Sequence, residues 1–182
     1  MLDLSNTRAA PPLVPSALVQ PLPPASRYVL RGKQLVMAAA GAALGLNISD
    51  TACRSAQQGS RAALWMGPDE QLLLSSVEDG PTIGRHLGEA LKGMPHSLVD
   101  ISHRQLGLAL SGALAETVLN AGCPLDLHPA SFPVGMCTRT LLGKADIVLW
   151  RTGSDSFHVE VWRSFAEYVA RFLAEAAREF AI

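Results

Sequence analysis

The sequence predicts an α+β protein made of two pseudo-repeated strand–helix–strand–strand–helix units with mostly antiparallel strand pairing. Three observations support this fold class. A short strand that ends in glycine, followed by a helical stretch and a second glycine, occurs twice along the chain. A two-strand pattern follows each of these segments, and a helix pattern closes each unit.

The first unit begins with the predicted strand Tyr28–Gly32, whose sequence is YVLRG. A helical stretch follows over Lys33–Leu44 and stops before a glycine, the residue that most often ends a helix. The segments Arg61–Met66 and Gln71–Ser75 are predicted to pair as a hairpin, because the Gly-Pro-Asp sequence between them is a strong turn signal.

The second unit repeats this order. Leu106–Gly112 is predicted to be a strand and Ala113–Ala121 a short helix. Two strands follow over Thr138–Leu142 and Ile147–Arg151, and Phe157–Trp162 is predicted to pair with the latter across a turn that contains glycine and serine.

A helix pattern closes each unit. The first runs from about Pro81 to Lys92, with Asp79 as a candidate N-cap. The second begins near Ser164, which forms a capping-box pattern with Glu167. Its apolar residues recur at helical spacing and predict one face packed on a sheet; they are Phe165, Val169, Leu173, Ala176 and Phe180.

We expect two regions in the chain. Residues 1–26 form a Pro-rich N-terminal arm, which is either a disordered leader or a segment that lies across a partner subunit. Residues 27–182 form a single α+β domain of two tightly packed halves, 27–97 and 98–182.

Composition restricts the possible functions. Charged residues are only 17% of the 182 residues, which suggests that a partner covers part of the surface. The net charge of −1 and the 5% aromatic content argue against nucleic acid and anionic lipid as ligands. The longest apolar run, Leu35–Leu46, is too short to span a membrane. The odd number of cysteines, 3, and the absence of a secretory signal pattern favour a cytoplasmic location.

Residues 100–135 are dense in side chains that often perform chemistry, yet they match no catalytic motif. The 5 histidines include no pair spaced for zinc, and no CxxC motif occurs, so we expect no metal site. If residues 100–103 form a strand, Asp100 and Ser102 point away from His103, which argues against a catalytic triad. No phosphate-binding glycine motif occurs, so we expect no FAD or NAD site in this chain.

Contact with other subunits is the remaining role for these side chains. The tryptophans suit either core packing or interface anchors, and arginines directly follow two of them. The predicted subunit-interface residues are His103, Arg104, Asp126, His128, Phe132, Trp150, Arg151, Trp162 and Arg163.

Five blocks of this sequence, taken together, resemble the gamma subunit of bacterial heterotetrameric sarcosine oxidase. They cover most of the chain after about residue 60 in conserved order; they are ALWMGPDEQLLL (63–74), VDISHRQLGLALSG (99–112), AGCPLDLHPASFPVG (121–135), RTLLGKADIVLWR (139–151) and FHVEVWRSFAEYV (157–169). The resemblance implies a fold similar to the folate-binding domains of aminomethyltransferases and tRNA-modifying GTPases.

The resemblance also implies a role in a complex. Such complexes oxidatively demethylate sarcosine to glycine with oxygen and release hydrogen peroxide, while the methyl carbon leaves as formaldehyde or as methylenetetrahydrofolate. FAD, FMN and NAD belong to the alpha and beta subunits and zinc to the delta subunit. We therefore expect a non-catalytic gamma subunit that supports assembly with the alpha, beta and delta subunits.

Two alternatives remain open. The chain could be a folate-binding module in its own right, since its expected fold is shared with folate-binding domains. It could also be an accessory subunit of a related oxidase that acts on another N-methyl amino acid.

Overall fold

The computed structural model describes residues 18–180, which form two five-stranded sheets and four helices. Most of the predicted N-terminal arm, residues 1–17, lies outside the described residues. In chain order the elements are β1 (Val19–Pro21), β2 (Ala25–Gly32), α1 (Gln34–Leu44), β3 (Ser55–Gln58), β4 (Arg61–Gly67), β5 (Glu70–Ser76), α2 (Gly80–Ala90), β6 (His96–Asp100), β7 (Gln105–Ser111), α3 (Ala115–Asn120), β8 (Cys137–Leu142), β9 (Ala145–Gly153), β10 (Ser156–Trp162) and α4 (Arg163–Arg178).

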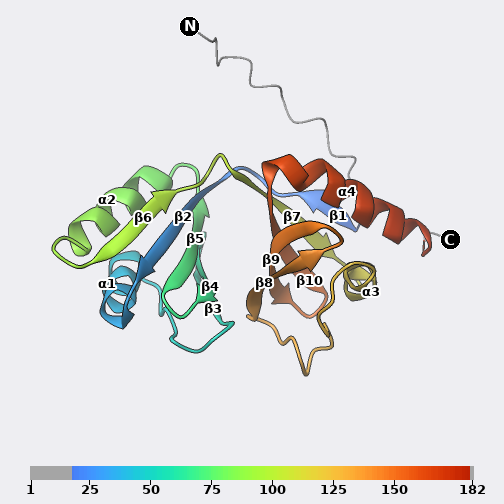
Figure 1. Cartoon of the computed structure of the whole chain (residues 1–182), viewed down its shortest axis with the longest axis horizontal. Helices are drawn as coiled ribbons and strands as arrows, with labels where there is room; N and C mark the ends of the chain where they lie inside the picture. The colour runs from blue at the N-terminus through green and yellow to red at the C-terminus, as the bar shows by residue number, and fades with distance from the viewer. Residues whose placement is uncertain (1–17, 181–182) are drawn as a thin grey trace, which may run out of the picture.

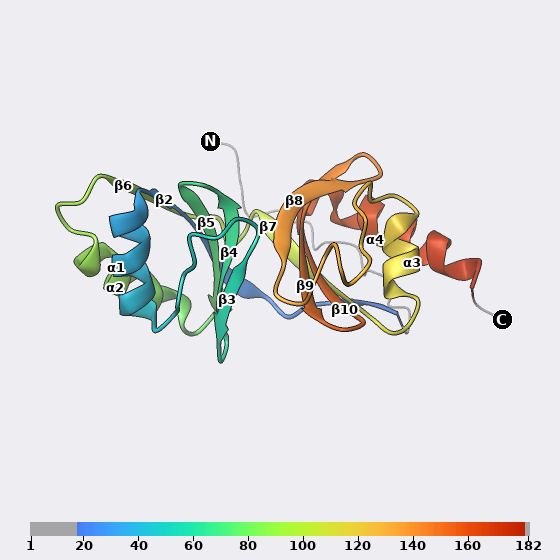
Figure 2. The same cartoon turned by 90° about the horizontal axis from the view of Figure 1, so that it is seen from below.

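The two sheets lie in the middle of the molecule and the helices lie outside them (Figure 1; Figure 2). One sheet has the strand order β3-β4-β5-β2-β6 and is covered by α1 and α2. The other has the order β1-β7-β10-β9-β8 and is covered by α3 and α4. All strand pairs in the described residues are antiparallel, so the predicted fold class and pairing are confirmed.

The strand orders reveal the repeat more fully than the sequence does. In the first sheet β6 pairs with β2, the first strand of its unit, and β1 pairs in the same way with β7, the first strand of the second unit. The N-terminal strand therefore completes the second sheet, with Val19 opposite Leu110. The folded part of the chain already includes residues 18–26, which the sequence assigned to the arm. Because β6 belongs to the first sheet, that unit extends to Asp100 and does not end at 97.

Strands and helices fall close to their predicted positions, but neither predicted cap makes a side-chain capping hydrogen bond. Asp79 is the N-cap residue of α2, as predicted, but its side chain makes no capping hydrogen bond. Its carboxylate instead binds Arg61, with Oδ2 and Oδ1 at 2.6 and 2.9 Å from the guanidinium nitrogens. Helix α4 begins at Arg163, and neither Ser164 nor another side chain caps it. Strands β3 and β6 were not predicted, since their sequences are largely polar and their residues mostly exposed.

Three apolar clusters form the core. One lies beneath α1 and α2, and a second beneath α3 and α4. The third lies between the facing sheets and consists of Ala62, Leu64, Met66, Leu72, Leu74, Ile101, Cys137, Val148 and Trp150. This middle cluster joins the two units, so the sheets are held together by apolar packing as well as by backbone connections.

None of the helices in residues 18–180 is both long enough and apolar enough to cross a bilayer.

Candidate functional site

A buried ion pair connects the two sheets. Arg27 projects from β2, and its Nε and Nη2 atoms donate to Glu160 of β10 at 2.6 and 2.9 Å. The two side chains are 3% and 0% exposed. A bidentate arginine–carboxylate pair of this kind satisfies both charges, which is the condition for burying them. The pair therefore fixes the position of one unit on the other.

His158 completes the pairing of this carboxylate. Its Nε2 atom lies 2.7 Å from Oε1 of Glu160, and its ring packs 5.7 Å from that of Trp150. Burial alone would raise the pKa of Glu160, but hydrogen bonds from His158 and Arg27 outweigh it and hold the pKa below its ordinary value. Gly107 lies opposite Glu160 in the sheet, where a Cβ would come within 3.2 Å of both Glu160 and His158.

A second ionic contact crosses between the sheets. The Glu70 carboxylate, 5% exposed, accepts hydrogen bonds from Arg31 of β2 and Arg139 of β8. Both arginines are more than half exposed, so water screens their outer surfaces.

A cleft with a volume of about 430 Å³ opens between the sheets beside these contacts. Its walls are largely apolar, and its polar members are Arg104, Gln105, Arg139, Thr140, Asp146 and Glu160. Within the described residues the buried Gln105 side-chain oxygen accepts no hydrogen bond. The cleft has the size of a small-molecule site, but Glu160 and Arg139 already have ionic partners.

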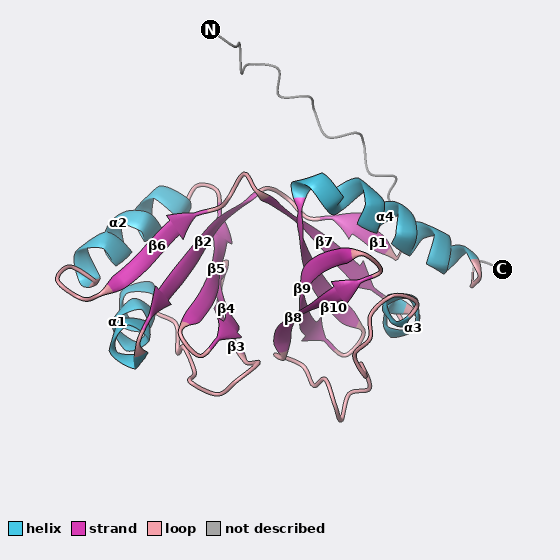
Figure 3. Ribbon diagram, in the orientation of Figure 1, coloured by secondary structure: helices cyan, strands magenta, loops and turns pink. Residues whose placement is uncertain are grey.

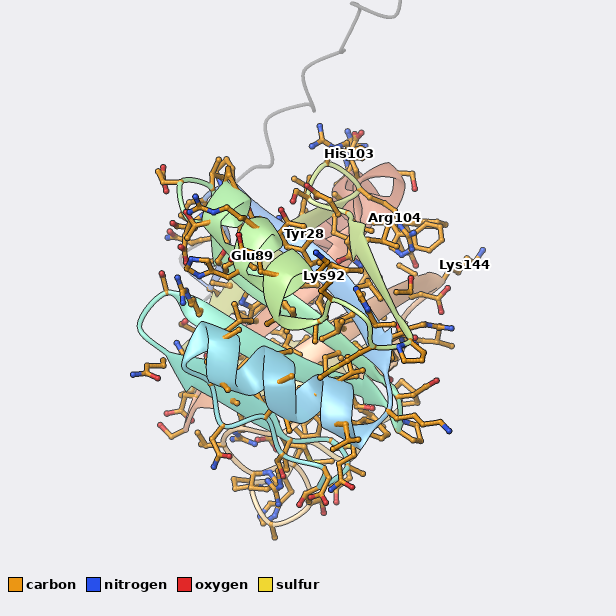
Figure 4. The ribbon with its side chains drawn as sticks, turned by 90° about the vertical axis from the view of Figure 1, so that its left-hand side faces the viewer. Tyr28, Glu89, Lys92, His103, Arg104 and Lys144 are labelled. Atoms are coloured by element: carbon orange, nitrogen blue, oxygen red, sulfur yellow. The ribbon has the colours of Figure 1, made fainter. Side chains whose placement is uncertain are left out.

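An arginine stacked on a tryptophan marks the mouth of this cleft. The Arg104 guanidinium lies 4.4 Å from the centre of the Trp162 ring, a cation–π contact. Trp162 is 44% exposed, and Leu141, 46% exposed, also lines the cleft. We call Arg104, Leu141 and Trp162 the Arg104–Trp162 surface. Figure 4 shows Arg104 beside His103 at the upper edge in that view, on the segment that joins β6 to β7.

Four of the predicted interface residues come together here. Arg104 and Trp162 are in contact, and Arg163 donates its backbone N–H to the Arg104 carbonyl at 2.9 Å. His103 adjoins Arg104 and is exposed, as is Arg163. These residues lie at the end of β10 that carries Trp162.

Asp126, His128 and Phe132 lie elsewhere, in the long loop between α3 and β8 (Figure 3). Asp126 accepts hydrogen bonds from the Ser131 hydroxyl at 2.6 Å and from the His128 backbone N–H at 3.0 Å, and these bonds, in that order, lower its pKa. The Asp126 carboxylate therefore stabilises the conformation of the loop in which it lies. The Phe132 side chain is 1% exposed and belongs to the core beneath α3 and α4.

Arg151 donates hydrogen bonds to backbone carbonyls of this loop. Its Nη1 atom donates to the carbonyls of Leu127 and Phe132 at 2.7 and 3.0 Å, and its Nε atom lies 3.2 Å from the Ser154 carbonyl. Arg151 pairs in register with Phe157, at the opposite end of β10 from Trp162. The structure thus separates the predicted residues into two groups at opposite ends of one strand.

Phe132, Trp150 and Arg151 were predicted to contact other subunits, but their side chains are buried within this chain. They are only 1%, 5% and 2% exposed, and their neighbours are residues of this chain. The sequence did not distinguish them from exposed residues because tryptophan and arginine are frequent both in interfaces and in satisfied interior positions.

The turn after β6 also differs from expectation. Residues 102–104 form a turn and do not continue a strand. Asp100 consequently reaches Ser102, whose hydroxyl and backbone N–H donate to Oδ1 at 2.6 and 2.8 Å. The Asp100 carboxylate therefore bonds the serine hydroxyl itself. In a catalytic triad a histidine lies between the carboxylate and the serine, so this arrangement does not activate a nucleophile. Within residues 18–180, no three His, Cys, Asp or Glu side chains lie close enough to hold a metal.

Sequence reasoning missed the charged residues that join the sheets, namely Arg27, Glu70, Arg139 and Glu160. One signal was present. A glutamate in the middle of the alternating strand Ser156–Trp162 faces away from the apolar residues Phe157, Val159 and Val161, so it needs a partner on the other side of the sheet.

The geometry first defines a class of protein: a two-unit α+β domain with facing sheets, of the kind found in aminomethyltransferases. The aminomethyltransferase of the glycine cleavage system from Bartonella henselae superposes with a TM-score of 0.68 at 14% identity, over 88% of this chain and 46% of that one. At that identity the likeness shows the fold.

The chain belongs to the sarcosine oxidase, gamma subunit family, whose model matches residues 32–179. It is 37% identical to the sarcosine oxidase subunit gamma of Arthrobacter sp over 150 residues, which are 82% of this chain and 71% of the relative. A chain of the heterotetrameric sarcosine oxidase from Corynebacterium sp. U-96, solved with pyrrole 2-carboxylate, superposes with a TM-score of 0.84 at 32% identity, over 90% of this chain and 85% of that one.

Proposed function

We propose that this chain is a non-catalytic subunit of a heterotetrameric sarcosine oxidase, in which it packs against the larger subunits and supports assembly. The complex would demethylate sarcosine to glycine with oxygen and release hydrogen peroxide, with formaldehyde or methylenetetrahydrofolate as the second carbon product. Its partners would be alpha, beta and delta subunits. FAD, FMN, NAD and zinc would be held by those partners.

The observation that carries this proposal is the Arg104–Trp162 surface. Tryptophan and arginine dominate the binding energy of protein interfaces, and here they are stacked and exposed, with Leu141 lining the same cleft. The stacked ring also restrains the long arginine side chain, which lowers the entropy lost on binding. The charged groups deeper in the chain, Arg27 and Glu160, are by contrast satisfied internally.

Co-expression with the neighbouring subunits tests the proposal. We expect the full chain to co-purify with them, and the mass of the intact complex to include one copy of it. We expect Trp162→Ala to weaken co-purification at least tenfold, which corresponds to about 1.4 kcal/mol or more of binding energy. Phe180→Ala is the matched control, because Phe180 is comparably exposed, 38% against 44%, and lies outside this surface.

Two results would contradict the proposal. One is unchanged co-purification of the Trp162→Ala variant while the chain remains folded by circular dichroism. The other is stoichiometric yellow flavin on the purified single chain, or oxidation of sarcosine by that chain without its partners.

The cleft favours folate binding by the chain itself as a second candidate function. Folate needs a carboxylate or similar group for its pterin ring and basic groups for its glutamate tail, and Asp146, Arg104 and Arg139 line the cleft. The fit is partial, since Glu160 is saturated by Arg27 and His158, and Arg139 is paired with Glu70. Titration of the full chain with tetrahydrofolate, followed by calorimetry, separates this function from an assembly role.

A related oxidase that acts on another N-methyl amino acid could contain the same kind of subunit. Substrate choice would then lie with the partner that binds substrate. Assay of the reconstituted complex against sarcosine and other N-methyl amino acids distinguishes these cases, because the preferred substrate is the one with the highest kcat/KM.

A further inference from the structure

Two cysteines lie at opposing backbone positions where a segment of the first unit meets a segment of the second. Arg54 and Met136 form an isolated antiparallel bridge between the segment before β3 and the segment before β8. Cys53 precedes Arg54 and Cys137 follows Met136, so the two cysteines are the next pair along this antiparallel bridge. The Cys137 backbone N–H donates to the Cys53 carbonyl at 3.0 Å, so the two residues occupy opposing positions.

We propose that Cys53 and Cys137 are a peroxide-oxidisable pair that can close a disulfide across the seam between the two units. Opposing residues of an antiparallel bridge have Cα atoms about 4.5–5.5 Å apart. Disulfides join Cα atoms about 4.4–6.8 Å apart, so the backbone spacing is suitable.

The two cysteines differ in access. Cys53 is partly exposed, whereas Cys137 is fully buried, and its Sγ lies 3.9 Å from the Trp65 carbonyl oxygen. Burial, ahead of smaller contributions, raises the pKa of the Cys137 thiol to about 12. Cys53, the more accessible of the two, is therefore the one that a peroxide reaches first, and Cys137 acts second.

The backbone at Cys53 is unusual. Its φ of 59° is in the left-handed region, and it is the non-glycine residue with positive φ among those described. This conformation is unfavourable for a residue with a Cβ and persists because the flanking backbone hydrogen bonds hold it. Ser55 contributes to this restraint, since its N–H and hydroxyl donate to the Gly135 carbonyl at 2.9 and 2.8 Å.

The oxidant in this reaction is hydrogen peroxide. The Cys53 thiol loses its proton, and the thiolate attacks one peroxide oxygen. The O–O bond breaks, the released hydroxide takes up the proton, and a sulfenic acid and water result. The Cys137 sulfur then attacks the sulfenic sulfur, the S–O bond breaks, and a second water leaves with the Cys137 proton. In total, two thiols and one peroxide give one disulfide and two waters.

Oxidation of the full chain with hydrogen peroxide, followed by alkylation of free thiols, tests the pair. We expect digestion and mass spectrometry to identify a linked Cys53–Cys137 peptide that lacks two hydrogens. Tryptic cleavage leaves Cys123 and Cys137 on one peptide, since no Lys or Arg lies between them, so the Cys123→Ser variant is used in parallel and should form the same link. We also expect a melting temperature raised by roughly 5–10 °C and restored by dithiothreitol, because the link closes a long loop.

The variants decide the outcome. Cys53→Ser should abolish both the linked peptide and the thermal shift. The partly exposed position makes this variant safer for folding than a change at the buried Cys137. The proposal is overturned if oxidation yields only sulfinic acid at Cys53, a link through Cys123, or a disulfide between two copies of the chain.

Discussion

Arg27 and Glu160, 133 residues apart in the sequence, meet as a buried bidentate ion pair between the two sheets. The two units are similar, yet they do not each contain such a pair. In the second sheet Gly107 is opposite Glu160, whereas in the first sheet Arg27 is opposite Leu74. The absence of a side chain at Gly107 leaves the space in which the carboxylate and His158 lie. The two units therefore differ here: the second supplies Glu160 and the space beside Gly107, and the first supplies the Arg27 guanidinium.

Removal of one partner of this pair should destabilise the fold strongly. We expect Glu160→Gln to lower the free energy of unfolding by about 3–5 kcal/mol, because the Arg27 charge is left buried without its partner. Urea denaturation measures this change. Glu175→Gln is the control, since Glu175 pairs with Arg178 on the surface, and we expect about 0.5 kcal/mol or less there. Equal effects of the two substitutions would show that Glu160 is not a central contact.

The same carboxylate should make stability depend on pH. Because its pKa is lowered in the folded chain, its contribution is present above the unfolded glutamate pKa, near about 4.3, and is lost as the pH falls through the folded value. We therefore expect the stability difference between wild type and Glu160→Gln to shrink progressively below about pH 4. Denaturation midpoints measured between neutral and acid pH test this, and a constant difference would contradict it.

Gly107 should not tolerate a methyl group. A Cβ there would lie 3.1 Å from Leu22 Cδ1 and 3.2 Å from both Glu160 Oε1 and His158 Nε2. We expect Gly107→Ala to cost about 1–3 kcal/mol of unfolding free energy through overpacking. Gly88→Ala, in α2, has no neighbour within 4 Å of its new Cβ and should instead be neutral or stabilise by up to about 1 kcal/mol. Thermal denaturation of the two variants gives the comparison directly.

Arg151 should determine the order of the loop between α3 and β8. We expect Arg151→Lys to cost about 2–4 kcal/mol, since an ammonium group cannot reproduce the planar set of bonds to Leu127, Phe132 and Ser154 carbonyls. Hydrogen exchange should become faster at the Phe132 amide while β7 stays protected. Arg178→Lys, on an exposed ion pair, is the control and should leave both measurements unchanged.

The strands and helices could be predicted from the sequence because their signals are local. The alternation in Ser156–Trp162 predicts which residues enter the core, and the structure places Phe157, Val159 and Val161 there. The glycine after Leu44 ends α1 in the left-handed conformation, as expected for a helix C-terminus. Each of these features depends on residues within a few positions of one another.

The contacts between the units could not be predicted in this way. The partners of Arg27 and Glu70 are set by how two sheets face each other, which no local pattern contains. Strand β1 was missed for a related reason. Its proline, Pro21, argues against a strand, but Val19–Pro21 lies at the edge of its sheet, where the lack of a backbone N–H is tolerated.

The placement of β1 has a consequence for synthesis. This strand emerges from the ribosome about ninety residues before its partner β7, as the pairing of Val19 with Leu110 shows. At roughly 5–20 residues per second, the segment waits about 5–20 seconds for a sheet to join. During that time the first sheet can form from β2 to β6 without it. The segment of the described chain that is made first is therefore among the last to reach its final position, because it completes the second sheet only after β7 has been made.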